Sequence, residues 1–293
     1  MAKTIGVDIG GTKTAIGLFK DGVLEQKQEI KTDAKLGGEH VLSRIIEVIL
    51  PYVDDDLKGI GVGAAGQINR AGEVMSSTDT FTNWKGVNVK QIISRATSSR
   101  VEVVNDGQAM GLGELHFGAG KNVRDFICIA LGTGVGGAII ADGGLIRGYL
   151  GAAGEFGHMR IYTDGRTCPC GNKGCLEAHV SGVALESRYK EMFGTNDKGL
   201  FIFQKARNRD ENTLEIVNQY LDDLIEGLTS LIHIFNPEKV VIGGGVATSL
   251  IPYMTCINNT IHKKVNDVNA EVLVELSTLG GNAMLLGAAS LVM

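Results

Sequence analysis

The sequence contains little proline and no long hydrophobic run. Only 4 of its 293 residues are proline, and its glycines follow no Gly-X-Y period, so the chain is neither collagen-like nor of low complexity. No run of 18 apolar residues occurs, which argues against a transmembrane helix. The formal net charge is -5, whereas a surface for nucleic acid or anionic lipid needs a basic excess. We therefore expect neither a nucleic-acid partner nor a membrane partner.

The amino terminus and the composition are typical of a cytoplasmic globular protein. The acidic residue Asp8 interrupts the apolar stretch at the amino terminus, which is not the pattern of a signal peptide. Hydrophobic residues make up 44% and charged residues 21% of the chain, an ordinary balance for a folded protein. The length suits one large domain or two moderate ones. We expect a cytoplasmic location, where thiols stay reduced.

Glycine, by contrast, is present in surplus. The chain has 41 glycines, about twice the average share, and ten of them fall between Gly132 and Gly157. Glycine lets the backbone turn tightly and approach a ligand closely. Clusters of glycine near the ends of strands therefore suggest turns that bind a ligand.

Hydrophobic periodicity predicts alternating strands and helices, and hence an α/β fold. The expected strands are residues 4–8, 14–19, 23–30, 57–63, 101–104, 126–131, 135–141, 239–242 and 271–276. The expected helices are residues 39–52, 106–117, 212–235 and 282–293, with a further helix directly after Gly245. Residues 5–12 align with residues 127–134, and both segments read as strand, glycine turn and strand. This repeat indicates two related α/β halves, or it is a chance match between two common patterns.

The first glycine loop has the features of a phosphate-binding turn. Backbone N–H groups at Gly10 and Gly11 suit phosphate oxygens, the Thr12 hydroxyl adds a donor, and Asp8 suits Mg²⁺, directly or through water. The loop lacks the Walker A spacing and leads into a strand, not a helix. A tight β-turn without a ligand is the alternative. The second copy, residues 132–137, favours two loops that hold one polyphosphate.

Two other strand ends carry candidate functional residues. Residues 243–245 are three glycines after a predicted strand, which suits a flat ligand, an anion or a simple connection. Asn105 and Asp106 follow the strand at residues 101–104. A carboxylate at the carboxyl end of a strand is where a general base would lie in an α/β protein. Asp106 is also a candidate for the N-cap of the helix that follows.

A cysteine-rich segment is the strongest motif. Cys168, Cys170 and Cys175 are three of the five cysteines and lie within eight residues, and His158 precedes them. In a reducing compartment, three thiolates and one imidazole form a tetrahedral zinc site. Disulfides and unliganded thiols are the alternatives, but an odd number of clustered cysteines favours zinc. Because all four ligands would come from the protein, we expect a structural site.

These motifs together resemble the ROK family, named for repressors, open reading frames and sugar kinases. The match covers essentially the whole chain, and its most specific part is Glu155-Phe156-Gly157-His158, Cys168-Pro169-Cys170-Gly171 and Gly174-Cys175-Leu176-Glu177. The resemblance implies the actin/hexokinase-like ATPase fold, with two α/β domains around a cleft. The expected domains are residues 1–106, completed by residues 281–293, and residues 107–280, with a zinc-binding insertion at residues 158–177.

The resemblance also implies a function, the ATP-dependent phosphorylation of a hexose or N-acetylhexosamine at O6. Asp106 would be the general base, and Asp8 would position Mg²⁺. The residues around the ATP phosphates would be Gly10, Gly11, Thr12, Lys13, Thr133 and Gly134, and those facing the adenosine Gly244 and Gly245. The sugar would contact Gly66, Asn105, Asp106, Glu155, His158 and Glu177.

Several finer expectations follow from the same resemblance. Asn83-Trp84 is similar to a family region near the sugar, although Trp84 is also a candidate for simple packing. Gln108 stands where many family glucokinases have asparagine and where N-acetylmannosamine kinases can have glutamine, so glucose and N-acetylmannosamine are both candidate substrates. Family repressors carry a winged helix-turn-helix before the first loop, which here begins at residue 8. We expect a kinase, with a non-catalytic sugar-sensing regulator as the alternative. The family resemblance alone implies a homodimer.

Overall fold

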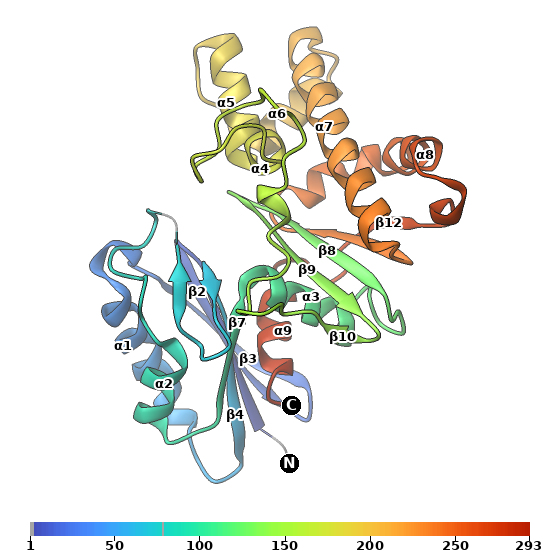
Figure 1. Cartoon of the computed structure of the whole chain (residues 1–293). Coiled ribbons are helices and arrows are strands. Elements are labelled where there is room, and N and C mark those ends of the chain that lie inside the picture. The colour runs from blue at the N-terminus through green and yellow to red at the C-terminus, as the bar shows by residue number, and fades with distance from the viewer. Residues whose placement is uncertain (1–2, 78) are drawn as a thin grey trace. The chain divides into compact units, whose positions relative to one another are not determined.

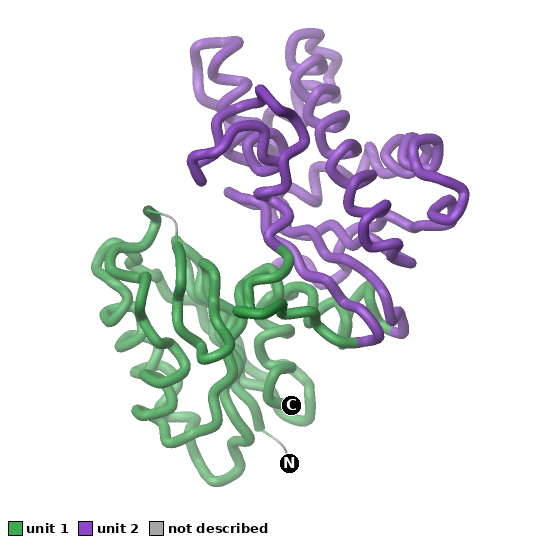
Figure 2. Tube along the Cα trace, viewed as in Figure 1, with its two compact units in different colours: residues 1–121, 144–154, 282–293 green, residues 122–143, 155–281 purple. Residues whose placement is uncertain are grey.

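The structure is a computed structural model that describes residues 3–77 and 79–293. The chain forms two compact units (Figure 2). Unit 1 comprises Met1–Lys121, Gly144–Gly154 and Asn282–Met293, and unit 2 comprises Asn122–Gly143 and Glu155–Gly281. Three segments that are far apart in the sequence therefore build unit 1, and each unit is described below by itself.

Unit 1 is built on a five-stranded sheet with the order β3-β2-β1-β4-β7 (Figure 1). The strands are β1 (Lys3–Ile9), β2 (Lys13–Lys20), β3 (Val23–Lys31), β4 (Leu57–Ala64) and β7 (Val101–Asn105). β1 pairs antiparallel with β2 and parallel with β4, which in turn pairs parallel with β7. A small hairpin of β5 (Gln67–Ile68) and β6 (Val74–Ser76) follows β4.

Helices cover both faces of this sheet. Ile5, Val7 and Ile9 of β1 point to the face covered by α1 (Gly38–Ile49) and α2 (Val89–Thr97), where they join one buried core. The alternate residues of β1 face α9 (Ala283–Ser290), which packs in turn against α3 (Asp106–Phe117) (Figure 1). The carboxyl-terminal helix thus completes the amino-terminal unit.

Glycine makes the close packing of α9 possible. A Cβ atom at Gly61 of β4 would lie 1.8 Å from the Ala288 backbone oxygen, and one at Gly287 would lie 1.6 Å from the Ala109 backbone oxygen. Real side chains do not tolerate such distances, so these glycines let helix and sheet backbones touch. Part of the glycine surplus therefore serves packing, whereas the sequence analysis assigned the clusters to ligand-binding turns.

Unit 2 contains β8 (Phe126–Leu131), β9 (Val135–Ala141), β11 (Lys239–Gly243) and β12 (Leu273–Leu276). Their sheet has the order β10-β9-β8-β11-β12, with the short edge strand β10 (Gly144–Leu145). The helices are α4 (Glu177–Val180), α5 (Gly182–Phe193), α6 (Gly199–Arg207), α7 (Glu211–Phe235) and α8 (Met254–Lys264). All five contribute side chains to one core with the apolar face of β8 (Figure 1).

The long helix α7 has clear sequence reasons for its ends. Asp210 is its N-cap, and the Asp210 carboxylate accepts a hydrogen bond of 2.8 Å from the Thr213 backbone N–H. Its C-cap Asn236 is left-handed, with φ 42°, and Pro237 then prevents a further turn. The predicted helix at residues 212–235 is therefore confirmed.

The α/β fold class is confirmed, with differences in detail: α2, α5 and α6 are not among the expected helices. After Gly245 the chain forms a 3-10 helix, Ala247–Tyr253, before the α-helix α8 begins at Met254. Pro252 lies within this segment and lacks the N–H that a regular α-helix would need there. Sequence periodicity also missed α5, because only four of its twelve residues are buried and one of these is Arg188.

Helix α3 lies in unit 1, whereas the sequence analysis assigned residues 107–280 to the second domain. The reason is its packing against α9, where a Cβ at Gly113 would lie 2.1 Å from the Ala283 backbone oxygen. Within residues 3–77 and 79–293, no helix has the length and apolar character needed to cross a membrane.

Candidate functional site

The loop between β1 and β2 is a rigid turn with two exposed polar side chains. The Gly10 backbone N–H donates to the Lys13 carbonyl at 3.2 Å and closes the turn. Thr32, at the end of β3, braces it from below, because its hydroxyl donates to the Gly10 carbonyl at 2.7 Å and its N–H to the Thr12 carbonyl at 3.0 Å. Thr12 and Lys13 are exposed. The loop can therefore offer donors to a ligand without reorganising.

Asp8 at the end of β1 carries an unusual carboxyl group. Its pKa is raised to about 7, mainly by burial and next by the nearby charge of Asp106. Two carboxylates in one poorly hydrated place disfavour each other's ionised form. A divalent cation would remove this conflict, since carboxylate oxygens are the ligands that Mg²⁺ prefers. The residues present therefore fit Mg²⁺ beside Asp8.

Asn105 and Asp106 occupy different positions at the start of α3. Asn105 is the N-cap, and its side-chain oxygen accepts from the Gly107 N–H at 2.8 Å. Its amide group donates to the Gly66 carbonyl at 2.8 Å. Asp106 is the first residue of the helix, and the interpretation of Asp106 as the N-cap is wrong. Its carboxylate accepts a hydrogen bond of 2.8 Å from the Gly107 backbone N–H, in the first turn of the helix.

The loop after β4 is fixed by its neighbours. Gly66 has a φ of 99°, and a Cβ there would lie 2.5 Å from the Ser76 backbone oxygen, so only glycine fits. Trp84 is 1% exposed, stacks on Phe81 and donates from its indole nitrogen to the Ala65 carbonyl at 2.8 Å. Trp84 is therefore packing that holds this loop, the second of the two roles considered for it.

The second glycine loop, between β8 and β9, repeats the turn of the first. The Gly132 N–H donates to the Gly134 carbonyl at 2.9 Å, and Thr133 is exposed. Here a carboxylate braces the loop: Glu177 accepts from the Val135 N–H at 2.9 Å. A Cβ at Gly134 would lie 2.5 Å from that carboxylate. A side chain at this position would therefore require the Glu177 carboxylate to move.

The glycines after β11 have two different roles. Gly244 has a φ of 88°, and a Cβ there would lie 2.4 Å from the Leu131 backbone oxygen, so it touches the base of the second loop. No described heavy atom outside the adjacent residues lies within 4 Å of a Cβ built at Gly245. Gly245 therefore borders open space at the end of β8, where a flat ligand would find room.

His158, Cys168, Cys170 and Cys175 converge as a candidate metal site. Their ligand atoms lie within 4.8 Å of one another, with 3.7 Å between the sulfurs of Cys170 and Cys175. A zinc tetrahedron with Zn–S bonds of about 2.3 Å has sulfur–sulfur edges of about 3.8 Å. All five cysteines are free thiols, and a disulfide bond is far shorter than 3.7 Å. The donor set and its spacing fit zinc.

The electrostatics of this cluster also fit a metal. Burial raises the pKa of both Cys168 and Cys175, so these thiols stay protonated at neutral pH without a cation. A coordinated metal ion supplies the positive charge that deprotonates thiols. The described cluster is therefore poised for a cation and poorly suited to three free thiolates.

Two acidic residues lie beside the cysteine cluster, one next to His158 and one next to Cys168. The Nδ1 of His158 lies 3.9 Å from the Cys168 sulfur, and its Nε2 lies 3.9 Å from the Glu155 carboxylate. Glu177 lies beside the same cysteine, with 4.0 Å between a carboxylate oxygen and the Cys168 sulfur. Unit 2 thus brings together the four candidate zinc ligands and the predicted sugar contacts Glu155 and Glu177. Unit 1 separately brings together Asp8, Gly66, Asn105 and Asp106.

Sequence reasoning missed two residues that position these loops. Thr32 braces the first loop but lies 22 residues from Gly10, and no local pattern marks it. Gln108 is 1% exposed and its amide donates to the carbonyls of Gly151 and Ala153, both at 2.9 Å. Gln108 stood out in the sequence because many family glucokinases have asparagine there. Its partners, the Gly151 and Ala153 carbonyls, are visible only in the structure.

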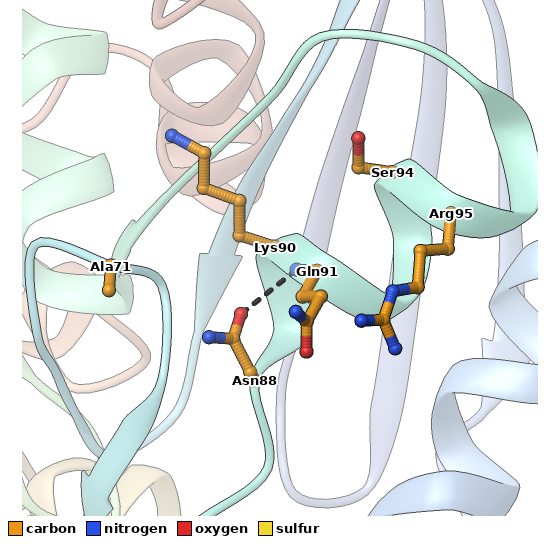
Figure 3. A pocket seen from close by; sticks show the side chains of 6 residues that line it. All are labelled: Ala71, Asn88, Lys90, Gln91, Ser94 and Arg95. Carbon is orange, nitrogen blue, oxygen red and sulfur yellow. Dashed lines mark hydrogen bonds between the residues drawn. The ribbon is translucent and has the colours of Figure 1, made fainter.

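A separate pocket of about 340 Å³ lies at the start of α2 (Figure 3). It is lined by Ala71, Asn88, Lys90, Gln91, Ser94 and Arg95. Asn88 is the N-cap of α2 and accepts from the Gln91 N–H at 2.9 Å, while Lys90 pairs with Glu102. Asn88 and Lys90 thus already have structural partners, and none of the predicted site residues lines the pocket.

Comparisons with known proteins agree with the motifs. The model of the ROK family matches residues 4–293. A glucokinase of Thermotoga maritima is 34% identical over 261 residues, which are 84% of this chain and 82% of the relative. An N-acetylmannosamine kinase of Haemophilus influenzae is 27% identical, with coverages of 98% and 94%. The crystal structure of a ROK family glucokinase from Streptomyces griseus in complex with glucose and AMPPNP has a TM-score of 0.85, 31% identity and 99% coverage of both chains.

Proposed function

The chain belongs to the ROK family, and on that premise we propose that it is an ATP-dependent sugar kinase that phosphorylates a hexose or N-acetylhexosamine at O6. The observation that carries the proposal is the acidic pair of unit 1, Asp106 at the start of α3 with Asp8 close enough to feel its charge. A non-catalytic sugar sensor has no need of a general base, so this pair favours the kinase.

Asp106 is the proposed general base. It accepts the proton of the attacking sugar hydroxyl, and its place as the first residue of α3 fixes its backbone for that step. Asn105 fixes the local geometry, because it caps α3 with its side-chain oxygen and holds the Gly66 carbonyl with its amide. Phosphoryl transfer needs little covalent chemistry from the protein, so positioning of this kind accounts for most of the catalysis.

The two glycine loops are the proposed phosphate sites. Gly10, Gly11, Thr12 and Lys13 bind phosphate oxygens from the first loop, and Thr133 and Gly134 bind them from the second. Mg²⁺, held by Asp8, would neutralise charge on the transferring phosphoryl group. Gly244 and Gly245 face the adenosine, a role supported by the open space beside Gly245.

The proposed sugar contacts are the six residues that the family resemblance implies. Unit 1 supplies Gly66, Asn105 and Asp106, and unit 2 supplies Glu155, His158 and Glu177. A structural zinc ion bound by His158 and the three cysteines would fix the imidazole ring, so that its other nitrogen keeps one orientation. Glucose and N-acetylmannosamine are the proposed substrates, because relatives of both specificities match the chain.

We further propose a cytoplasmic homodimer. The free thiols of the cysteine cluster support a reducing compartment. The dimer rests on family membership alone, and light scattering of the purified protein tests it: a mass of one chain at micromolar concentration would contradict it.

A panel assay tests the kinase proposal. Purified protein is incubated with MgATP and with glucose, N-acetylmannosamine or N-acetylglucosamine, and ADP release is measured. At least one sugar should give sugar-dependent release. The matched control is the 6-deoxy analogue of the active sugar, which lacks the accepting hydroxyl and should inhibit without turnover. Sugar binding without ADP release from any sugar would contradict the kinase and support the sensor.

A further inference from the structure

Unit 2 contains a buried polar cluster that the proposed chemistry does not use. We call it the anchor network: Tyr162, His179, Arg188 and Asp223. Asp223 of α7 is 2% exposed, His179 of α4 is 5% exposed and Arg188 of α5 is 7% exposed. Polar groups buried this deeply destabilise the fold unless they are paired with one another.

Asp223 is the centre of the anchor network. Its carboxylate pairs with the Arg188 guanidinium and accepts a hydrogen bond of 2.8 Å from the Tyr162 hydroxyl. His179 Nδ1 lies 3.3 Å from the same carboxylate. The other ring nitrogen of His179 lies 3.3 Å from the Arg166 backbone nitrogen, whose N–H donates to it, and the Arg188 guanidinium lies 3.1 Å from Nδ1.

These contacts reach the segment that carries the zinc ligands. Residues 158–177, the zinc loop, contain Tyr162 and Arg166 between His158 and Cys168. Arg166 and Tyr162 also pair with the other side of the loop: the Gly174 N–H donates to the Arg166 carbonyl at 2.9 Å, and the Tyr162 N–H to the Gly174 carbonyl at 3.3 Å. The anchor network thus holds both sides of the zinc loop through one carboxylate on α7.

Ring packing adds to the hydrogen bonds. The Tyr162 ring lies over His179, with 5.0 Å between ring centroids. A Cβ at Gly165 would lie 2.7 Å from His179 Nε2, so the loop backbone sits directly on the imidazole. Burial and the Asp223 hydrogen bond raise the pKa of Tyr162 to about 12, so its hydroxyl remains a donor.

We propose that the anchor network is a positioning device that preorganises the zinc loop for metal binding. An unanchored loop would have to lose its conformational freedom when it closes on the ion, which weakens binding. Fixed to α5 and α7, the loop has lost that freedom on folding. Outer partners of metal ligands typically change metal affinity 10- to 100-fold. This inference rests on the proposed zinc site, and Tyr162 is its most testable member.

The experiment compares two tyrosine hydroxyls. Tyr162→Phe removes the hydrogen bond to Asp223. The matched control, Tyr220→Phe, removes a buried hydroxyl on α7, the helix that also carries Asp223. The Tyr220 hydroxyl donates to the Val180 carbonyl at 2.8 Å and does not contact the zinc loop. Zinc affinity is measured under reducing conditions by competition with a chromogenic chelator, at a temperature where circular dichroism shows both variants folded.

The expected result is a loss of zinc affinity of about tenfold in Tyr162→Phe, with less than a twofold change in Tyr220→Phe. Equal zinc affinity in Tyr162→Phe and the wild type would overturn the anchor network while leaving the zinc site intact. Equal losses in both variants would also overturn it, because the effect would then be one of general stability. A wild-type protein that binds no zinc would overturn the zinc site itself.

A surface variant of the same loop adds a second control. Arg166 also pairs with Glu191, whose side chain is 59% exposed. Exposed ion pairs contribute little, so Glu191→Gln should leave zinc affinity unchanged within about twofold. A loss as large as that of Tyr162→Phe would mean that any contact to the loop matters and would contradict a specific role for the buried network.

Discussion

Unit 1 and unit 2 repeat one arrangement of strands and fill it with different residues. The order β2-β1-β4-β7 in unit 1 corresponds to β9-β8-β11-β12 in unit 2, with the same parallel and antiparallel pairs next to the glycine loop. Asp8 pairs with Gly63, and at the equivalent place Ala130 pairs with Gly243. The repeat seen in the sequence is therefore structural and not a chance match.

The first difference is charge. Unit 1 has a carboxylate at position 8, whereas unit 2 has the small apolar Ala130. The loop of unit 2 is instead braced from outside by Glu177. The duplicated frame thus carries different side chains in its two halves: the acidic pair Asp8 and Asp106 lies in unit 1, and the loop held by Glu177 lies in unit 2.

The second difference is glycine content in the central strands. Gly6 and Gly61 of unit 1 correspond to the buried residues Cys128 and Val241 of unit 2. The glycines exist because α9 lies against this face at backbone distance. Tight packing of α9 and α3 fixes the start of α3, where Asp106 is. Glycine in these strands therefore lets α9 pack at backbone distance, and α9 in turn packs against α3.

The largest expected effect on stability comes from replacing Gly61 of unit 1 by valine, the residue at the equivalent position 241 of unit 2. Gly61→Val places a side chain where even a Cβ would lie 1.8 Å from the Ala288 backbone oxygen. α9 would have to move away from the sheet, so the free energy of unfolding should fall by about 4 kcal/mol or more. Urea denaturation measures it. Gly245→Ala, which meets open space, is the control and should change stability by less than about 1 kcal/mol. Similar values for the two variants would contradict the packing role.

The acidic pair predicts that the free energy of unfolding depends on pH through Asp8. The pKa of Asp8 is raised to about 7 in the folded protein from its ordinary value of 3.8, so the folded state binds an extra proton between about pH 4 and pH 7. Stability is therefore lost as the pH rises through that window. Asp8→Asn lacks this loss, and its stability advantage should grow by on the order of 2 kcal/mol between pH 5 and pH 8. Denaturation curves at both pH values test this; an advantage independent of pH would contradict the raised pKa.

Removal of zinc should weaken the nucleotide loop of unit 2 alone. Glu177 lies beside Cys168 and also holds the Val135 N–H, so loss of the metal should loosen residues 132–135. We expect the affinity for a non-hydrolysable ATP analogue to fall about tenfold after chelation and to return when zinc is added back. Isothermal titration calorimetry measures it. An unchanged affinity in metal-free protein would mean that the two features are independent.

The fold could be predicted largely because its strands and long helices are strongly apolar or strongly periodic. β8, β9 and α3 lie at the expected residues, and α7 begins within one residue of the expected place. The missed helix α5 buries a charged network in place of an apolar stripe, so its hydrophobic pattern is weak. The assignment of α3 failed for a different reason: its partner α9 lies 166 residues further along the chain, and no local pattern encodes that contact.

The candidate site could be predicted where one segment holds all the residues. Cys168, Cys170 and Cys175 share a short loop, and the structure brings them together with His158. The bracing residues could not be predicted, because Thr32 and Glu177 act on loops from distant elements. Asp106 was a candidate for the N-cap of α3, but the N-cap is Asn105. Adjacent Asn and Asp are equally good caps, and only the backbone distinguishes them.

The most direct test of the account is the turnover of Asp106→Asn with the best sugar of the panel. The variant keeps the shape of the side chain but cannot accept a proton, so kcat should fall at least about 10²-fold. Nucleotide affinity should stay within about twofold of the wild type, because the glycine loops are unchanged. Full turnover in Asp106→Asn would contradict the central claim that this residue is the general base of a sugar kinase.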